Sequence, residues 1–204
     1  MKYGGSFLST NLKGKLILIT GANSGIGKAT AAQLAQMQAH VIMLCRNQES
    51  ASAAKNEILT QSPKANVDIM IVDLASLADV KRVAKEINVK YPRLDVLINN
   101  AGVFNQKRTT TTDGLEATFG VNYLAHFALT LLLLDLLKKS AAARIINVSS
   151  DIHRFMGINM KDLMSERNYN SQKAYSNSEA ALVLITNALS HRLQELKVAI
   201  VCAY

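Results

Sequence analysis

Three glycines near the start of the chain have the spacing of a phosphate-binding loop. They lie in TGANSGIG, residues 20–27, between an apolar run and a helix-like stretch. Glycine lets the backbone turn tightly and approach a ligand, and the unpaired N–H groups at the start of a helix attract anions. We therefore expect the loop to hold dinucleotide phosphates, although its first two glycines are further apart than in the commoner GxGxxG. The residues expected to contact the cofactor here are Gly21, Asn23, Ser24, Gly25, Ile26 and Gly27.

The elements that must position this loop alternate between strand-like and helix-like runs. Expected strands cover residues 16–19, 41–44, 67–72, 94–98, 144–148 and 198–202. Expected helices cover residues 26–37, 49–60, 77–90, 113–139 and 172–196. Such alternation is typical of a parallel sheet with helices on both faces. The sequence therefore predicts an α/β fold, a Rossmann-like doubly wound sheet that residues 1–204 form as a single domain.

The end of the second expected strand indicates which dinucleotide the fold binds. There the chain reads LCRN, residues 44–47. In a dinucleotide fold this point reaches the adenosine ribose, where a carboxylate would bind the 2′-hydroxyl and an arginine would accommodate a 2′-phosphate. Arg46 therefore favours NADP(H) over NAD(H). The competing acid, Glu49, falls in the first turn of the next expected helix, where the helix dipole explains a carboxylate and Asn47 is the expected cap.

Two further loops at the carboxyl edge of the expected sheet point to the same cofactor. Asp73 and Leu74 end the third strand near any bound adenine, although a helix cap explains Asp73 nearly as well. Asn100, Ala101 and Gly102 follow the fourth strand, where amides and small residues can close over the middle of a cofactor, or can form only a turn. We include all of these among the expected cofactor-binding residues.

Composition narrows the classes of function. The net charge is +8, but the basic residues are scattered, so we expect no nucleic-acid partner and ascribe the charge to a surface that suits a phosphorylated cofactor.

Residues 1–15 hold no apolar run long enough for a signal peptide or membrane span, and polar residues interrupt the apolar stretch 121–137, so no transmembrane anchor is expected. Cys45 and Cys202 lie in apolar strand-like runs, and the sequence favours reduced core thiols in a cytoplasmic protein.

Together these motifs resemble those of the short-chain dehydrogenase/reductase family over nearly the whole chain. Beyond TGANSGIG, Asp73-Leu74 and NNAG (residues 99–102), the resemblance is carried by Asn122 in FGVNYLAHF, Ser150 after the fifth strand and Tyr175 in AYSNSEAALVLIT. The pieces LCRN, DGLEATFGVNYLAHFALT and SSDIHRF are most similar to the retinol dehydrogenase branch. The resemblance implies hydride transfer between the nicotinamide of NADP(H) and a lipophilic alcohol or carbonyl.

The resemblance also implies roles at a catalytic site. Tyr175 would be the general acid/base, Ser150 would hydrogen-bond the substrate oxygen, and Asn122 would hold a water in a proton relay. The family places a lysine four residues after the tyrosine, where it binds the nicotinamide ribose and lowers the pKa of the tyrosine. Glu179 occupies that position here. An anion in place of this cation would raise the pKa of the tyrosine instead of lowering it, so we expect turnover to suffer more than cofactor binding.

A second tyrosine offers a competing register. Tyr169 and Lys173 also form a literal YxxxK, which would restore the lysine. The residues after Tyr175 nevertheless resemble the family's run after its own tyrosine, and those after Lys173 do not, so Tyr175 is the preferred candidate. His126 and His153 are expected to be structural, and no clustered His, Cys and Asp residues suggest a metal site.

The chain stops at Tyr204, just after the sixth expected strand. Family members continue there through a substrate-covering segment and a further strand, so this sequence is expected to lack both, as a fragment or as a short form. If the chain is complete, the sixth strand becomes an exposed apolar edge, which predicts poor solubility or a compensating partner.

Three interpretations follow, in order of preference. The first is an NADP(H)-dependent oxidoreductase similar to retinol dehydrogenases, and the second is a catalytically impaired cofactor-binding pseudoenzyme or scaffold. The third is a peripheral protein that contacts a membrane surface through its basic charge. The helices that carry Asn122 and Tyr175 are also candidates for a homodimer interface, although a buried core helix explains the apolar run 128–137 equally well.

Overall fold

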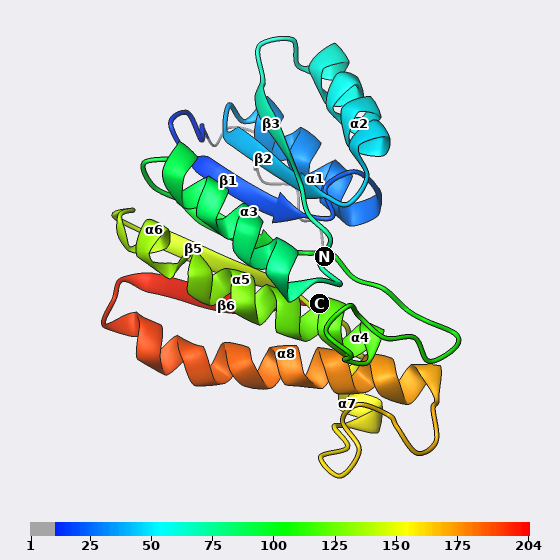
Figure 1. The fold of residues 1–204 in the computed structure, drawn as a ribbon. Coiled ribbons are helices and arrows are strands. Elements are labelled where there is room, and N and C mark those ends of the chain that lie inside the picture. The colour runs from blue at the N-terminus through cyan, green and yellow to red at the C-terminus, as the bar shows by residue number, and fades with distance from the viewer. Residues whose placement is uncertain (1–10) are drawn as a thin grey trace, which may run out of the picture.

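Six parallel strands form the centre of the computed structural model, which describes residues 11–204 (Figure 1). The strands are β1 (Leu16–Thr20), β2 (His40–Cys45), β3 (Asn66–Ile71), β4 (Val96–Asn99), β5 (Ala143–Val148) and β6 (Val198–Ala203). Their order in the sheet is β3-β2-β1-β4-β5-β6, and every neighbouring pair runs parallel. The predicted Rossmann-like arrangement is confirmed, and the strand order reverses between β1 and β4.

Helices cover both faces of this sheet. The helices are α1 (Gly25–Gln36), α2 (Gln48–Gln61), α3 (Leu77–Lys90), α4 (Ala117–Phe119), α5 (His126–Leu132), α6 (Leu134–Lys138), α7 (Ile152–Met156) and α8 (Ser171–Gln194). Figure 1 shows α3, α5 and α8 in front of the sheet. Leu16 and Leu18 of β1 belong to the core formed with those three helices, whereas Ile17 and Ile19 belong to the core formed with α1 and α2. The alternation of a strand thus divides the apolar side chains between two layers.

Residues 113–139 do not form the single helix that the sequence predicts. Helix α4 begins only at Ala117, because the Glu116 carboxylate accepts hydrogen bonds from the N–H groups of Thr118 and Phe119 at 2.9 and 2.7 Å. Gly120–Ala125 is then π-helical, and a break separates α5 from α6. A π-helical turn adds a residue to the local period, so it changes which side chains face the sheet.

The other predicted elements need only small adjustments. Helix α3 spans the predicted residues, and β4 starts two residues later than the predicted 94–98. Helix α7 has only five residues, and the sequence analysis did not predict it. A helix of little more than one turn leaves no periodic pattern in a sequence.

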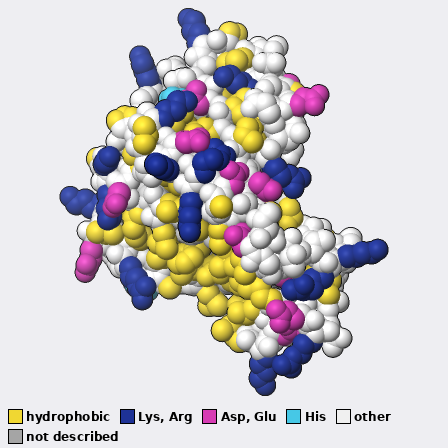
Figure 2. Space-filling view, viewed as in Figure 1, with side chains coloured by type: hydrophobic (Ala, Val, Ile, Leu, Met, Phe, Trp, Pro, Cys, Tyr) yellow, Lys and Arg dark blue, Asp and Glu magenta, His cyan; other side chains and the backbone are white. Residues whose placement is uncertain are grey.

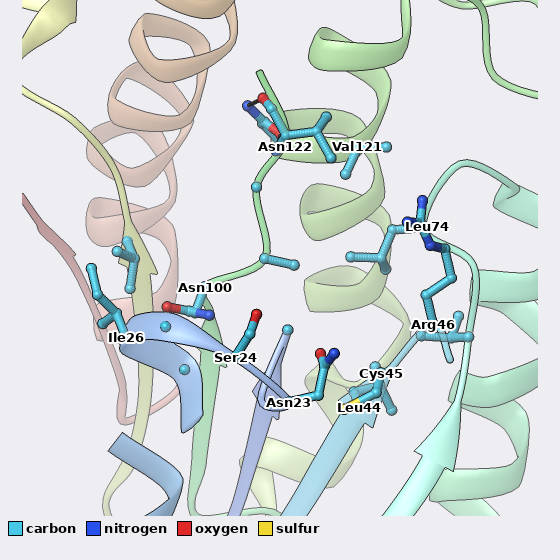
Figure 3. Close-up of a pocket in the computed structure, with 18 of the residues that line it drawn as sticks. Asn23, Ser24, Ile26, Leu44, Cys45, Arg46, Leu74, Asn100, Val121 and Asn122 are labelled. Atoms are coloured by element: carbon cyan, nitrogen blue, oxygen red, sulfur yellow. Dashed lines mark hydrogen bonds between the residues drawn. The ribbon is translucent and has the colours of Figure 1, made fainter. Parts of the chain in front are cut away.

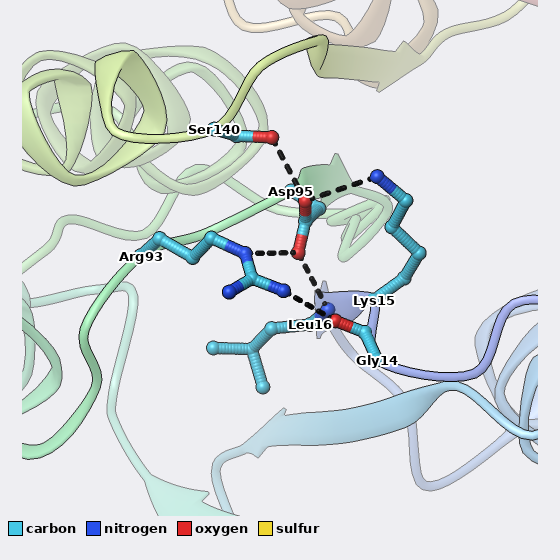
Figure 4. A network of polar contacts seen from close by, with 6 residues as sticks. All are labelled: Gly14, Lys15, Leu16, Arg93, Asp95 and Ser140. Atoms are coloured by element: carbon cyan, nitrogen blue, oxygen red, sulfur yellow. Dashed lines mark hydrogen bonds and ion pairs between the residues drawn. The ribbon is translucent and has the colours of Figure 1, made fainter.

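Asp95 ties the amino ends of β1 and β4 together (Figure 4). Its carboxylate accepts hydrogen bonds from the Leu16 N–H at 2.9 Å and the Ser140 hydroxyl at 2.8 Å, and it pairs with Lys15 at 3.3 Å and Arg93 at 3.2 Å. Burial raises the pKa of this carboxyl, but the hydrogen bonds and the two cations together hold the pKa below its usual range. The network fixes the register of β1 against β4 at the edge of the sheet opposite their carboxyl ends.

β6 forms one edge of the sheet. Val198 and Ile200 are buried toward α8, whereas Ala199, Val201 and Ala203 are exposed. The side chains of β6 therefore alternate between a buried and an exposed face, as in a sheet that is covered on one side.

Within residues 11–204, no helix has the length and apolar character needed to cross a membrane. The expectation that residues 1–15 contain no signal peptide falls mostly on residues 1–10, which lie outside the described residues.

Candidate functional site

A cleft of about 780 Å³ opens at the carboxyl ends of the strands, next to the point where the strand order reverses. Ligands of open α/β sheets bind at such a position. The cleft is lined by every residue predicted to bind the cofactor, and by Asn122, Tyr175 and Glu179 from the predicted catalytic set. Ser150 is not among its lining residues, whereas its neighbour Ser149 is.

The glycine loop packs closely against the protein at two of its glycines and leaves open space at the third. A Cβ at Gly27 would lie 2.4 Å from the Gly21 carbonyl oxygen, and a Cβ at Gly21 would lie 3.0 Å from the Ala101 Cα. Gly25 instead has φ +52°, and no protein atom lies within 4 Å of the position that a Cβ would take there. Only the middle glycine therefore leaves open space above the loop.

The start of α1 supplies the chemistry that a phosphate needs. The residue that precedes this helix, Ser24, makes no side-chain hydrogen bond to it. The first N–H groups of α1 consequently have no capping partner, and they begin at Gly25, which lines the cleft. Uncapped N–H groups at a helix start, combined with the helix dipole, fit an anionic group such as a pyrophosphate.

The Thr20 hydroxyl connects this loop to the NNAG turn. Its Oγ1 accepts hydrogen bonds from the backbone N–H groups of Asn100 and Ala101 at 2.8 and 2.9 Å, and it lies 3.0 Å from Nε2 of His126. The other ring nitrogen of His126, Nδ1, lies 2.9 Å from the Asn122 carbonyl oxygen. No local pattern in the sequence predicts Thr20 as a site residue or predicts this connection, because the partners are distant along the chain.

His126 is neutral in this network. Burial lowers its pKa to about 4, although the hydrogen bond to Asn122 opposes the shift. Since Nδ1 faces a carbonyl oxygen, it carries the proton, and Nε2 accepts from the Thr20 hydroxyl. The expectation that His126 is structural agrees with its burial beneath the cleft.

One end of the cleft is formed where β2 meets α2 (Figure 3). Arg46 is exposed at the end of β2 and lines the cleft. Asn47 caps α2 as predicted, since its Oδ1 accepts from the Ser50 N–H at 2.9 Å. The Asn23 amide donates to the Ser50 hydroxyl at 3.1 Å, so the glycine loop and α2 are joined beside Arg46.

Asp73 is not the cap of α3. The cap is Ser76, whose hydroxyl accepts from the Asp79 N–H at 3.2 Å. The Asp73 carboxylate instead accepts from the Ala75 N–H at 2.9 Å, and Asp73 and Leu74 both line the cleft. The helix-cap alternative for Asp73 is therefore wrong.

The π-helical turn positions Asn122 at the opposite end of the cleft. The Asn122 side chain accepts from the Val103 N–H at 2.8 Å and donates to the Val103 carbonyl oxygen at 3.0 Å. Its amide nitrogen also lies 3.3 Å from the Ser178 hydroxyl of α8. Asn122 thus braces the segment after NNAG against the helix that carries Tyr175.

Tyr175 and Glu179 lie one turn apart on α8 and both line the cleft. Burial raises the pKa of Tyr175, the nearby Glu179 carboxylate raises it further, and a contact with the Ser150 side chain opposes the rise. Glu179 is only 3% exposed. Burial raises the pKa of its carboxyl, while contacts with Ser149, the Ser150 backbone and Asn122 lower it. The Glu179 carboxylate therefore disfavours ionisation of Tyr175.

Ser150 lies beside the cleft. Its hydroxyl contacts Tyr175, and its Oγ accepts from the Ile152 N–H at 3.4 Å. Ser149 lines the cleft and was not predicted to do so. The two serines are adjacent in sequence, and only the structure distinguishes which of them borders the open space.

The competing tyrosine points elsewhere. Tyr169 precedes α8, and its hydroxyl donates to the Asn105 carbonyl oxygen at 2.8 Å. Lys173 is exposed in the first turn of α8. Neither residue lines the cleft, so the geometry favours Tyr175 over Tyr169.

Phe104 is a further cleft residue that the sequence analysis did not identify. Its ring packs edge-to-face against the ring of Tyr175, with 5.5 Å between the centroids. The side chain remains 44% exposed. It adds an apolar surface next to the Tyr175 ring.

The part of the chain that the structure describes holds no group of three or more His, Cys, Asp and Glu side chains suited to a metal ion.

Comparison with known proteins agrees with this geometry. The short chain dehydrogenase family pattern matches residues 15–204. Mouse retinol dehydrogenase 14 is 47% identical over 199 residues, and human retinol dehydrogenase 13 is 46% identical over 184 residues. The alignments include 93% and 90% of this chain but only 60% and 56% of those proteins.

Solved structures show the same likeness. An uncharacterized protein from Mycobacterium paratuberculosis superposes with a TM-score of 0.80 at 37% identity, covering 93% of this chain and 66% of that one. An Escherichia coli short chain dehydrogenase complexed with NADPH gives a TM-score of 0.77 at 29% identity, covering 95% of this chain and 77% of that one. The fold, the cleft and the matched sequence together assign this chain to the short-chain dehydrogenase family.

Proposed function

We propose that the cleft binds NADP(H) and that the chain supplies the cofactor-binding and proton-transfer residues of an oxidoreductase acting on a lipophilic alcohol or carbonyl. One cleft brings together the glycine loop, Arg46 and Tyr175, and this juxtaposition is the main support. The similarity to structures solved with NADP and NADPH supports the same cofactor.

The residues of the cleft fit such a cofactor along its length. The uncapped start of α1 suits the pyrophosphate, and Arg46 suits a 2′-phosphate through its guanidinium. Asn100, Ala101 and Gly102 form the wall between these groups and Tyr175. When bound, NADP(H) would supply or accept the hydride.

The proton chemistry falls to the residues of α8 and the loop after β5. The Tyr175 hydroxyl would exchange the proton with the substrate oxygen, and the Ser150 hydroxyl, in contact with Tyr175, would orient it. Glu179 works against ionisation of Tyr175, which places this tyrosine further from an efficient working pKa. The substrate class follows from the names of the related retinol dehydrogenases and from the apolar ring of Phe104 beside Tyr175.

The Glu179 carboxylate supports a second function, in which the chain binds NADP(H) but turns substrate over slowly or not at all. An anion one helical turn from Tyr175 raises the pKa of the proposed proton donor. The Glu179 carboxylate does not alter the glycine loop or Arg46, which are the binding residues at the other end of the cleft. Cofactor binding and turnover must therefore be measured separately.

Binding is tested first, by fluorescence titration of the protein with NADPH and with NADH. We expect NADPH to bind more tightly than NADH, and Arg46→Ala to weaken NADPH binding roughly tenfold or more while leaving NADH affinity nearly unchanged, since a charged hydrogen bond contributes about 1.5–3 kcal/mol. Equal affinity of the wild type for both cofactors would refute the proposed NADP(H) preference.

Turnover is tested next, with NADPH and retinal. The oxidoreductase proposal expects NADPH oxidation above the level of a Tyr175→Phe variant. Equal rates, with NADPH bound to both proteins, would favour the non-catalytic function. Because the aligned segments span only 60% and 56% of the two retinol dehydrogenases, the same assay should also be run on any longer form of the protein.

We further propose that a second copy of the chain pairs across α5 and α8. Figure 2 shows hydrophobic side chains gathered on the face that these helices occupy in Figure 1. Leu131 and Leu132 of α5 and Leu184 of α8 are 46%, 38% and 54% exposed. Sedimentation velocity should detect a dimer that Leu184→Lys disrupts, and a monomer at all concentrations would refute the pairing.

A further inference from the structure

Glu179 is a buried acid that borders the cleft without forming an ion pair to any described residue. It is 3% exposed and faces the same space as the glycine loop. Among the ion pairs of residues 11–204, none includes Glu179. Its contacts are with neutral groups, namely the Ser149 hydroxyl, the Ser150 backbone and the Asn122 amide. A buried carboxylate that lacks a cation is costly, and it reduces that cost by taking up a proton.

Three titratable side chains face Glu179 from the elements around it. Tyr175 lies one turn earlier on α8, His153 lies on α7, and Cys202 lies on β6. Tyr175 and Cys202 are neutral in their ordinary protonated forms, and the Glu179 carboxylate raises the pKa of both. A protonated His153 lowers the pKa of Glu179 through its charge, but the two make no ion pair. Among the described side chains, His153 is therefore the one whose positive charge would oppose protonation of Glu179.

A bound dinucleotide strengthens the tendency to protonate. The ligand carries several negative charges on its phosphates, and it displaces water from the cleft that Glu179 borders. Both effects disfavour a second anion, because repulsion between like charges grows when screening water is removed. A protonated carboxyl, in contrast, gains an O–H donor that can hydrogen-bond an oxygen acceptor of the ligand.

We propose that Glu179 binds the dinucleotide in its protonated form, so that NADP(H) binding takes up a proton at this carboxyl. The inference rests on the proposed cofactor function and makes Glu179 a determinant of cofactor affinity. The affinity of the cleft for NADPH then falls as pH rises, because a proton must be supplied for every molecule bound. A lysine at this position would produce no such dependence.

The experiment measures the dissociation constant of NADPH between pH 5 and pH 9 for the wild type and for Glu179→Gln. Glutamine has the same shape as the protonated acid but does not titrate. Above the pKa of Glu179, we expect the constant of the wild type to rise relative to that of Glu179→Gln, with a slope that approaches tenfold per pH unit for one proton. Parallel profiles for the two proteins would overturn the proposal.

Adenosine 2′,5′-bisphosphate provides a control that needs no mutation. It carries the 2′-phosphate but lacks the nicotinamide half of the cofactor. Its 5′-phosphate is a monoester with a second pKa of about 6, unlike the pyrophosphate of NADPH, so the two ligands are compared above about pH 7, where titration of groups near Arg46 affects both alike. In the wild type, we expect NADPH affinity to fall more steeply with pH than the affinity for this half-ligand. Equal slopes would overturn the proposal even if Glu179→Gln did not fold.

The two controls also separate the failure of this inference from the failure of the proposed function. If NADPH and the bisphosphate both bind with equal pH dependence, only the role of Glu179 is wrong. If neither ligand binds at any pH, the proposed cofactor function is wrong, and the proton uptake that rests on it is wrong as well.

Discussion

Thr20 and His126 are 106 residues apart in sequence, and their side chains lie 3.0 Å apart in the protein interior. The Thr20 hydroxyl donates to His126 and accepts from two N–H groups of the NNAG turn, so its hydrogen-bonding capacity is fully used. His126 in turn donates to the Asn122 carbonyl oxygen. One threonine therefore links the glycine loop, the NNAG turn and the π-helical turn.

Replacing Thr20 by valine should destabilise the protein, because valine keeps the shape but removes the hydroxyl. The N–H groups of Asn100 and Ala101 and Nε2 of His126 would lose their shared partner. We expect the free energy of unfolding to fall by about 2–4 kcal/mol, as several buried polar groups become unpaired. Urea unfolding measures the change.

Two substitutions serve as controls for Thr20→Val. Thr20→Ser keeps the hydroxyl and should retain most of the stability. Thr60→Val on α2 removes an exposed hydroxyl that bonds only the Asn56 carbonyl oxygen, and it should change the free energy of unfolding by no more than about 0.5 kcal/mol. A wild-type unfolding curve for Thr20→Val would contradict the role given to the network.

Adding a methyl group at Gly25 should weaken NADPH binding more than it weakens the fold. Gly25 has φ +52° and borders the cleft, and no protein atom lies within 4 Å of the added position. Gly114→Ala is the matched control, since Gly114 has φ +77°, equally open surroundings and no place in the cleft. Both variants should lose about 1–2 kcal/mol of stability from backbone strain. Only Gly25→Ala should raise the dissociation constant for NADPH, and equal affinities of the two variants would show that the loop does not contact the ligand.

Asp95→Asn should destabilise the fold at neutral pH and less so in acid. The pKa of Asp95 is lower in the folded state than its unfolded value of about 3.9, so the ionised carboxyl stabilises the protein above that value and this stabilisation is lost as pH falls through the folded pKa. At pH 7 we expect a loss of about 2–3 kcal/mol, mainly from weaker hydrogen bonds to the Leu16 N–H and the Ser140 hydroxyl.

Lys15 and Arg93 are 46% and 43% exposed at their side chains, so their ion pairs with Asp95 should contribute less than these hydrogen bonds. Asp135→Asn is the control, because the Asp135 carboxyl is 88% exposed and pairs only with Lys138 on the surface. Unfolding in urea at pH 7 and pH 3 distinguishes the two variants. An equal, small effect of both would contradict the anchoring role of Asp95.

Glu179→Gln should lower the pKa of the Tyr175 hydroxyl, and Glu179→Lys should lower it further. The Glu179 carboxylate is the charged group that raises this pKa, so removing the charge reduces the shift and reversing it adds to the reduction. NMR titration of ¹³C-labelled tyrosine, with Tyr175→Phe to assign the signal, reports the pKa directly. Glu86→Gln on α3 is a control that should leave the signal unchanged. An unaltered Tyr175 titration in Glu179→Gln would contradict the rise in this pKa that we ascribe to the Glu179 carboxylate.

The parallel sheet and most of the cleft could be predicted because short stretches of the sequence indicate them. Strand residues such as Leu16 and Ile19 are apolar on both faces, and the segments that follow β1, β2 and β4 carry glycines, amides or Arg46. Parallel strands bring these carboxyl ends to one edge, so order along the chain was enough to place the residues together.

The remaining features depend on contacts between distant segments. The π-helical turn at Gly120–Ala125 interrupts an apolar pattern that reads as one helix, and no local signal marks it. The pairing of Thr20 with His126 and the packing of Phe104 on Tyr175 arise only when the chain has folded. The choice between Ser149 and Ser150 depends on how the chain turns after β5, which neighbouring identical residues cannot reveal.

The place of β1 in the sheet has a consequence for the order of folding. β1 lies between β2 and β4, so one of its edges stays open until residues 96–99 join it. Pairing β1 with β4 closes the long segment between Thr20 and Val96. This closure costs conformational entropy before any contact compensates for it, so pairings between distant strands form slowly. The hydrogen bonds that tie Thr20, at the start of the glycine loop, to the NNAG turn can therefore form only after Asn100 and Ala101 have been synthesised.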